Sequence, residues 1–308
     1  MKIFPLRANE NWICDRFVSE WIMGNPEVST NNILEADIVW AVAGWCWNQI
    51  PPEILASKKF VITIHHIVPE KFTPDKLNEF MYRDRFVDLY HVPCQKTRNQ
   101  IARLTKKPIF TQPFWVNQSL WHPIDNKEIL REKYKVRGKY TIGSFQRDTE
   151  GSDLKSPKLE KGPDIFCNIV ESISKKRDDL HVILAGWRRQ YVIKRLEKSR
   201  IDYTYYELPE FNIINELYNI LDLYIVGSRW EGGPQSIVEC ASSETPIVST
   251  DVGYASRFLS ENSIFDVSSF ESATPDTVTA RENVEKYFIP GGFDPFLGKF
   301  LELLNEKR

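Results

Sequence analysis

The chain has 308 residues, of which 42% are hydrophobic and 27% charged, the composition of a globular protein of about two domains. Its 40 Lys and Arg against 42 Asp and Glu leave a formal charge of -2, without the basic excess that nucleic-acid binding usually requires, so we expect no nucleic-acid partner. No apolar run approaches the roughly 18 to 20 residues of a membrane span, and no signal peptide is recognisable, so we expect a cytoplasmic chain with no transmembrane segment, for which peripheral membrane contact stays open.

Short apolar runs alternate with helix-periodic segments in the first half of the chain, which is typical of strand-helix-strand units and a parallel sheet. The pattern predicts an α/β protein. Strands are expected at 2–6, 36–43, 59–64, 88–93 and 108–113, and helices at 14–23, 75–83 and 95–104.

The second half repeats the alternation. Residues 163–176 carry apolar side chains at helical spacing, which predicts a helix that packs on the sheet. Strands are expected at 140–145, 181–186, 202–207, 221–228 and 245–251, and further helices at 189–198, 212–220 and 234–243.

The composition changes from aromatic-rich to charged near residues 123–128, which predicts a boundary between two lobes. We expect an N-terminal lobe at 1–124, a C-terminal lobe at 125–285, and a helix within 286–308 that packs back on the N-terminal lobe. Seven of the nine tryptophans precede the boundary, and core packing is the simplest reading of most of them. Trp45 and Trp47 differ because they follow a strand beside Gly44, where ligand stacking competes with packing.

The five cysteines lie far apart and form no C-x-x-C pair, so the sequence suggests neither a zinc site nor a disulfide framework. We expect buried thiols. No D-x-D or H-E-x-x-H motif occurs, so we expect no metal and no cofactor.

Neither G-x-G-x-x-G nor a P-loop occurs, but residues 228–253 read SRWEGGPQSIVECASSETPIVSTDVG. Here a strand is followed by a double glycine and a helix that starts near Gln235. Glycine allows a ligand close to the backbone, and free N–H groups at Ser236 and Ile237 together with the helix dipole would favour an anion. A phosphate is the expected ligand, although a plain strand-to-helix turn would look similar.

This segment closely resembles the E-x7-E region of the family-four retaining glycosyltransferases. The resemblance extends over about residues 140–255, through IGSFQR at 142–147, KGPDIF at 161–166 and HVILAG at 181–186, and covers the N-terminal lobe only in outline. It implies a GT-B fold, with two Rossmann-like lobes facing a central cleft and the nucleotide sugar bound mainly by the C-terminal lobe. The N-terminal lobe is shorter than in the family.

The resemblance also implies particular roles in the C-terminal lobe. Glu231 matches the glutamate that contacts the transferred sugar, and Glu239 matches the one that binds the ribose. Backbone groups of the intervening turn would line the sugar and the pyrophosphate, at Gly232, Gly233, Pro234, Gln235, Ser236 and Ile237.

Arg147 and Lys161 match the cation pair that neutralises the departing diphosphate. Arg offers a planar fork and Lys a point charge to phosphate oxygens, which suits this task. An insertion at 148–160 separates them, so Lys158 competes with Lys161 for the second position.

His65 and His66 follow the strand predicted at 59–64, at the edge where open α/β sheets place ligands. His65 resembles the family histidine that faces the donor sugar, and His66 is its alternative. The segment 9–12 stands where many relatives carry a glycine-rich loop.

The implied function is a retaining transfer of a hexosyl unit from a nucleoside diphosphate sugar to a glycan or glycolipid acceptor. The alternatives are another GT-B enzyme, such as a sugar-nucleotide epimerase or a glycan phosphorylase, or a non-catalytic sugar-nucleotide binding protein. The sequence does not disclose the nucleotide base, the sugar, the acceptor or the oligomeric state.

Overall fold

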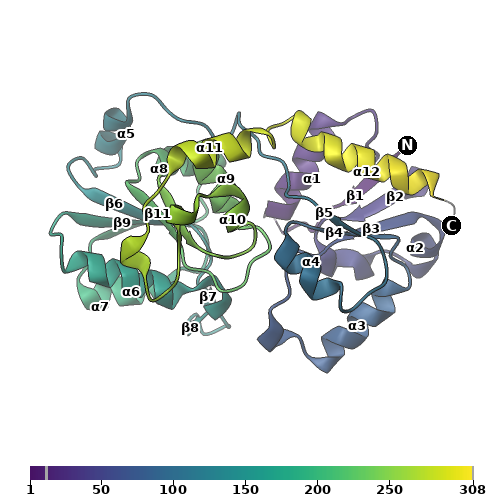
Figure 1. Cartoon of the computed structure of the whole chain (residues 1–308), viewed down its shortest axis with the longest axis horizontal. Coiled ribbons are helices and arrows are strands. Elements are labelled where there is room, and N and C mark those ends of the chain that lie inside the picture. The colour runs from purple at the N-terminus through teal and green to yellow at the C-terminus, as the bar shows by residue number, and fades with distance from the viewer. Residues whose placement is uncertain (11–12, 307–308) are drawn as a thin grey trace. The chain divides into compact units, whose positions relative to one another are not determined.

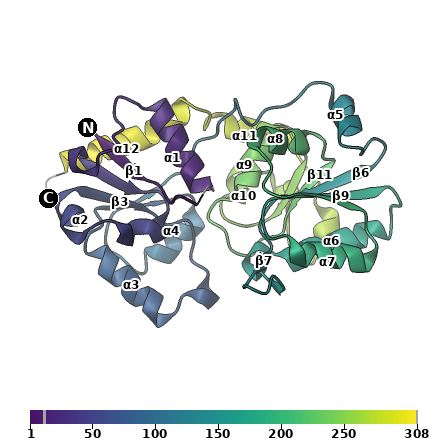
Figure 2. The same cartoon turned by 180° about the vertical axis from the view of Figure 1, so that it is seen from behind.

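A computed structural model gives the structure of the chain and describes residues 1–10 and 13–306. The chain divides into two units. Unit 1 contains Met1–Trp115 and Tyr287–Arg308, and unit 2 contains Val116–Lys286. Each unit is built on a parallel sheet with helices on both faces (Figures 1 and 2).

The sheet of unit 1 runs in the order β1-β2-β3-β4-β5, and all its strand pairs are parallel. Its strands are β1 Ile3–Leu6, β2 Ile38–Ala41, β3 Lys59–Thr63, β4 Leu89–Val92 and β5 Ile109–Thr111. Its helices are α1 Ile13–Gly24, α2 Pro52–Ser57, α3 Pro74–Asp84, α4 Gln95–Ile101 and α12 Asp294–Asn305.

Strand β2 shows why this sheet is covered on both sides. Every residue in it is buried, and successive side chains point to opposite faces. Ile38 and Trp40 join the cluster formed with α1 and α12, whereas Val39 and Ala41 join the cluster formed with α2, α3 and α4. The apolar run predicted at 36–43 is therefore a strand buried on both faces.

The chain leaves β1 and β2 in different directions. Helix α1 leads from β1 to a short segment whose Ser29 bridges back to Ile3 in parallel, while β1 pairs with β2 on its other side. The chain leaving β2 continues to β3, β4 and β5 instead. The five strands lie in sequence order, but the connections that leave β1 and β2 run in opposite directions, which makes the carboxyl ends of these strands a topological switch point.

The C-terminal helix α12 completes the core of unit 1. Phe296 and Phe300 are fully buried, and the ring of Phe300 lies 5.8 Å from that of Trp21 and 5.2 Å from that of Trp40. The helix-periodic apolar residues near the end of the sequence form this contact. The N-terminal residues alone therefore do not make the complete unit.

Unit 2 has the sheet order β10-β9-β6-β11-β12-β13. Helices α6 and α7 cover one face, and α8, α9 and α11 lie on the other (Figure 1). Its strands are β6 Tyr140–Ser144, β9 Leu180–Ala185, β10 Tyr203–Tyr206, β11 Leu223–Val226, β12 Ile247–Thr250 and β13 Ile264–Phe265, and β7 Thr149–Glu150 pairs with β8 Ser156–Pro157 in a separate hairpin. Its helices are α5 Lys127–Lys133, α6 Pro163–Ser174, α7 Gln190–Ser199, α8 Phe211–Asn219, α9 Gln235–Ser242, α10 Ala255–Phe258 and α11 Thr277–Glu285.

The order of unit 2 reverses between β6 and β11. From β6 the chain moves through α6 to β9 and then to β10, whereas from β11 it moves through α9 to β12 and β13. The carboxyl ends of β6 and β11 are neighbours in the sheet and form the switch point of this unit.

The first division between the units falls between Trp115 and Val116, earlier than the predicted boundary at 124/125. Hydrogen bonds to α8 explain the difference. Asn215 Oδ1 accepts from the N–H of His122 at 3.2 Å, and Asn219 Oδ1 accepts from the N–H of Ile124 at 2.8 Å. The change in composition marks the end of the aromatic-rich sequence, but these contacts assign residues 116–124 to unit 2.

All five cysteines are buried and free, as predicted. Trp45 and Trp47 differ in their surroundings. Trp47 is buried, whereas Trp45 keeps half of its surface exposed. Within the described residues, no helix combines the length and apolar character needed to span a membrane.

Candidate active site

The predicted donor-site residues of unit 2 lie on segments that leave the switch point between β6 and β11. Gln146 and Arg147 follow β6, and Ser228 to Glu231 follow β11. Because strand order reverses here, the two chain segments run apart, and open α/β sheets bind ligands at this place. The topology therefore gathers residues that are about 80 positions apart in sequence.

A close backbone contact fixes the turn before α6 against the turn after β11. Gly162 has φ +60°, and a Cβ atom on it would lie 1.7 Å from the carbonyl oxygen of Gly227. The carbonyl of Glu160 accepts hydrogen bonds from the N–H groups of Arg229 at 2.8 Å and Trp230 at 3.1 Å. Only glycine fits at position 162, and its fit brings Lys161 beside Glu231.

Lys161 and Glu231 form an ion pair with a direct hydrogen bond from Nζ to Oε1. Ser228 Oγ also donates to Glu231 Oε1, at 3.3 Å, and Gln146 Nε2 donates to the carbonyl of Lys161 at 2.7 Å. The Glu231 side chain is only 8% exposed. The carboxylate is thus held in one place, with a cation at its side.

Arg147 and Lys158 add further positive charge. Burial lowers the pKa of Lys158, and the neighbouring Lys161 and Arg147 lower it further. Burial likewise lowers the pKa of Arg147, with Arg188 as the second cause. Cations close enough to lower one another's pKa values favour an anion at this place.

The insertion between Arg147 and Lys161 folds out as the β7–β8 hairpin. The base of the hairpin is closed, because the N–H of Lys158 donates to the carbonyl of Asp148 at 2.8 Å. Arg147 Nε donates to the carbonyl of Thr149 at 3.0 Å. The inserted residues therefore do not separate the cations, and both Lys158 and Lys161 remain candidates for the diphosphate.

A fully buried ion pair, which the sequence analysis missed, lies beneath this hairpin. Arg189 Nε donates to Asp148 Oδ2 at 2.6 Å, and its Nη1 donates to the carbonyl of Ala185 at 2.8 Å. Arg189 Nη2 also donates to Ser144 Oγ at 3.1 Å. Arg189 thereby ties the ends of β6 and β9 to the residue next to Arg147. The two charges are 41 positions apart, and no local pattern links them.

The start of α9 matches the predicted turn, with one correction. A Cβ on Gly233 would lie 2.2 Å from the ring of Tyr254, so this position has no room for a side chain. Gln235 Nε2 donates to Tyr254 Oη at 3.0 Å. The expectation of a free N–H at Ile237 is wrong, because that group donates to the carbonyl of Pro234 at 3.0 Å and closes the first turn of the helix.

Glu239 lies on α9 with its side chain largely buried. Tyr218 Oη donates to Glu239 Oε2 at 2.8 Å. Burial, with Glu239 as the next cause, raises the pKa of Tyr218 well above its usual value, so this tyrosine remains a donor. The contact orients the carboxylate of Glu239 from the core side.

His65 belongs to unit 1, where it follows β3. Its Nε2 lies 2.9 Å from the carbonyl oxygen of Val42 and 3.5 Å from Cys14 Sγ, and its ring stacks on Phe114 at 5.9 Å. A carbonyl can only accept, so Nε2 carries the proton. Burial raises the pKa of Cys14 to about 12, so its thiol stays protonated.

The loop after β1 already holds an anion of its own. The N–H groups of Ala8 and Glu10 donate to the Asp15 carboxylate at 2.9 and 2.7 Å, and that of Asn9 donates at 3.0 Å. Of the predicted segment 9–12, Asn11 and Trp12 lie outside the described residues. Asp15 occupies the position that a phosphate would take at this loop.

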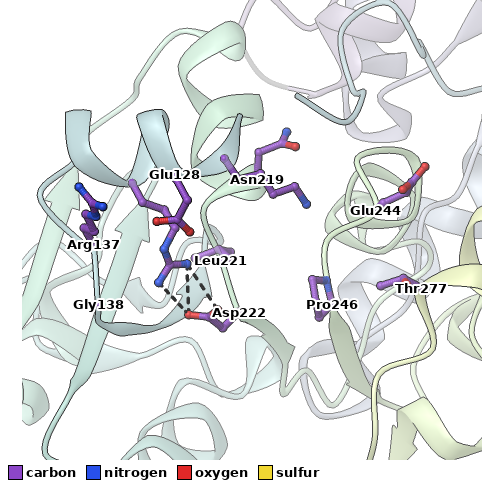
Figure 3. A pocket seen from close by; sticks show the side chains of 11 residues that line it. Glu128, Arg137, Gly138, Asn219, Leu221, Asp222, Glu244, Pro246 and Thr277 are labelled. Carbon is purple, nitrogen blue, oxygen red and sulfur yellow. Dashed lines mark hydrogen bonds and ion pairs between the residues drawn. The ribbon is translucent and has the colours of Figure 1, made fainter. Parts of the chain in front are cut away.

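A surface hollow of about 720 Å³ in unit 2 lies at the other end of the sheet, before β6, β11 and β12 (Figure 3). Arg131 donates from Nη1 to the carbonyl of Ile220 at 2.8 Å and pairs with Asp222 at 3.3 Å. These bonds join α5 to the sheet, so the charged residues there already serve the fold. The hollow is lined by Lys127, Glu128, Arg131, Arg137, Gly138, Asn219, Leu221, Asp222, Glu244, Pro246 and Thr277.

No group of three or more His, Cys, Asp or Glu side chains gathers as a metal site within residues 1–10 and 13–306.

Two Rossmann-like units of this topology define the GT-B fold, which is the fold of the glycosyltransferases to which the chain is structurally similar. HepE from Anabaena, solved in complex with UDP-glucose, shares 14% identity and a TM-score of 0.71 over 97% of this chain and 98% of that one. Sucrose-phosphate synthase from Thermosynechococcus elongatus shares 13% identity and a TM-score of 0.70 over 94% of this chain and 77% of that one.

Sequence comparisons agree with the fold. Residues 154–273 match the family described as Glycosyl transferases group 1. Over 154 residues the chain is 25% identical to the lipopolysaccharide core biosynthesis mannosyltransferase LpsB of Rhizobium meliloti (strain 1021), a match that covers 48% of this chain and 44% of that protein. The chain thus matches less than half the length of this curated relative. Together the similarities show a GT-B fold whose residues 154–273 match a family of glycosyltransferases.

Proposed function

We propose that the protein is a retaining glycosyltransferase that moves a hexosyl unit from a nucleoside diphosphate sugar to a glycan or glycolipid acceptor. The observation that carries the proposal is the pairing of Lys161 with Glu231 at the switch point of unit 2. A buried carboxylate beside a cluster of cations suits a substrate with a hydroxyl-bearing sugar at one end and a diphosphate at the other.

In this proposal the bond between the anomeric carbon and the phosphate oxygen breaks first, and its electron pair passes to the diphosphate. Arg147 and Lys161, with Lys158 nearby, stabilise the charge that develops on the leaving group. The acceptor oxygen then bonds to the anomeric carbon on the same face, and its proton passes to a phosphate oxygen. Glu231 would hold hydroxyls of the transferred sugar, and Glu239 would hold the ribose.

The similar proteins indicate which donors to test first. HepE was solved with UDP-glucose, and LpsB is a mannosyltransferase. Uridine and guanosine donors carrying glucose or mannose are therefore the first to test. We propose that the reaction needs no metal, because Arg and Lys can neutralise the diphosphate.

The proposal is tested by thermal unfolding of the full chain with UDP, GDP or ADP, each compared with its free nucleoside. A diphosphate at 100 times its Kd should stabilise the protein by about 2.7 kcal/mol, and the nucleoside should stabilise it far less. Lys161→Gln should remove this stabilisation. The matched control is Lys176→Gln, because Lys176 pairs with Glu271 on the surface of the same unit.

Release of the diphosphate from the donor, with and without candidate acceptors, then separates the alternatives. Transfer with the anomeric configuration kept supports the proposal. Binding without turnover would instead identify a sugar-nucleotide binding protein, and inversion of configuration would contradict the retaining mechanism.

A further inference from the structure

Trp45 and Trp47 lie on the same short turn, Gly44–Gln49, after β2, but they have opposite surroundings. Trp47 is 6% exposed, and its Nε1 donates to Glu79 Oε1 at 3.0 Å. Trp45 is 50% exposed. Packing therefore explains Trp47, whereas the proposed chemistry of unit 2 makes no use of Trp45.

The place of Trp45 in the topology is that of a ligand site. Glu10, Trp45 and His65 follow β1, β2 and β3, which are neighbours in the sheet. The chain that leaves β1 passes to the side of β1 away from β2, whereas the chain that leaves β2 continues to β3. Trp45 and Glu10 thus lie on the two segments that leave the switch point, where open α/β sheets bind their ligands.

The indole ring of Trp45 is held in one orientation. Its Nε1 donates to Glu10 Oε1 at 3.0 Å, and its ring lies 5.9 Å from that of His65 with an angle of 46° between the planes. The turn beneath it is packed tightly, because a Cβ on Gly44 would lie 2.4 Å from the carbonyl oxygen of Thr63. An exposed ring fixed in this way is preorganised for stacking.

The chemistry of the switch point excludes a phosphate as the natural ligand. Asp15 already takes the N–H groups of Ala8, Asn9 and Glu10. Glu10 adds a second carboxylate, which repels an anion but accepts hydrogen bonds from hydroxyl groups. A neutral ligand with an apolar face and several hydroxyls suits an aromatic ring beside a carboxylate.

We propose that Trp45 is a stacking platform for a pyranose ring of the acceptor glycan, with Glu10 as a hydrogen-bond acceptor for one of its hydroxyls. The axial C–H bonds of a pyranose carry partial positive charge, and the face of an indole is negative. The inference rests on the proposed function in taking the bound sugar as part of the acceptor. Binding of a sugar at Trp45 can itself be tested without turnover.

The first experiment follows the Trp45 indole N–H signal of the ¹⁵N-labelled full chain, assigned with Trp45→Phe. The probes are the methyl glycosides of α-glucose, α-mannose and β-galactose, at up to about 100 mM because weak sites of this kind have millimolar Kd values. Glucitol, which has hydroxyls but no pyranose face, is the control ligand. We expect the signal to move with at least one glycoside and not with glucitol.

The second experiment uses kinetics. Trp45→Ala should raise the KM for the acceptor about 10-fold and Trp45→Phe by less. Leu34→Ala is the control variant, because Leu34 is another exposed apolar residue of unit 1 but precedes β2 instead of following it. This variant should leave the acceptor KM unchanged.

A Trp45 signal that ignores every glycoside, or responds equally to glucitol, would overturn the proposal. So would an unchanged acceptor KM in a folded Trp45→Ala variant. If no nucleoside diphosphate binds and yet the glycosides move the Trp45 signal, the sugar site stands and only the proposed transferase function fails.

Discussion

Both units have a parallel sheet with a switch point, but different residues lie at the two switch points. In unit 2, Lys161 pairs with Glu231, and Lys158 interacts with Lys161, Arg147 and Glu231. In unit 1, the loop after β1 wraps its N–H groups around Asp15, and the turn after β2 exposes Trp45. The first arrangement is suited to an added anion, whereas the second already holds one.

In open α/β sheets, topology determines where a ligand can bind, and the side chains after the strands determine which ligand suits the site. A site lined by cations favours phosphates, whereas a loop whose N–H groups already bind a carboxylate does not. If this contrast is real, substitutions at the two switch points should have different effects on diphosphate binding.

The largest effect is expected at the ion pair that supports the switch point of unit 2. Arg189→Met leaves the buried Asp148 without its partner, and breaking a pair of this kind costs about 3–5 kcal/mol. Urea denaturation measures this loss. Arg195→Met is the control, because its pair with Glu171 is 27% exposed on both sides and should contribute about 0–1 kcal/mol. Equal losses in the two variants would contradict the supporting role of Arg189.

Glu231→Gln tests the chemistry of the same switch point. The substitution keeps the size but removes the charge that can stabilise a cationic anomeric carbon, so kcat should fall about 10²-fold or more with little change in diphosphate affinity. Arg229→Gln is the control. Arg229 lies two residues before Glu231 in sequence, but it pairs with Asp164 instead. Near-normal turnover in Glu231→Gln would remove this residue from the catalytic site.

Glu239→Ala should weaken binding of the nucleoside diphosphate and of the donor alike, because the ribose is common to both. The expected loss is about 1.5–3 kcal/mol, measured by isothermal titration. Tyr218→Phe is the control, since it removes the hydrogen bond to Glu239 but leaves the carboxylate in place. If the alanine variant bound the diphosphate normally, Glu239 would not contact the ribose.

Asp15→Asn tests the other side of the comparison. Weakening the bonds from the three N–H groups should cost about 1 kcal/mol of stability and leave diphosphate affinity unchanged. Asp75→Asn is the control, because Asp75 lies in the first turn of α3 in the same unit, where its charge favours the helix dipole. Loss of diphosphate binding in Asp15→Asn would assign the nucleotide to unit 1.

The smallest effect is expected from metal removal. Donor turnover in excess EDTA should equal that in buffer if, as we propose, the cations of unit 2 neutralise the diphosphate. Loss of activity that Mn²⁺ restores would show that side chains alone do not supply the positive charge.

The sequence predicts the elements whose burial is strong. The strand at 36–43 is apolar throughout because both faces of β2 are covered, and the helix at 163–176 shows its apolar face clearly because α6 packs on the sheet. Helix α11 escapes prediction because Ala280 and Val284 are its buried residues and its other positions are mixed. The β7–β8 strands are too short for a pattern to appear.

In the candidate site, too, the sequence predicts some residues and misses others. The resemblance to a known family predicts Glu231 and Lys161 as site residues. In the structure, the close fit of Gly162 against Gly227 brings them together. The Asp148–Arg189 pair and the Asp15 loop depend on three-dimensional contacts that no spacing discloses. Burial and hydrogen-bond partners, which identify such residues, belong to the folded chain alone.

The return of α12 to unit 1 affects how the chain folds during synthesis. Unit 2 is one continuous segment, Val116–Lys286, and it leaves the ribosome whole. The aromatic core around Trp21 and Trp40 instead waits for Phe296 and Phe300, which are translated only after unit 2. Domains generally fold as they emerge, so here the second unit has its complete sequence before the first. Until then, the nascent N-terminal segment exposes the apolar surface that chaperones recognise.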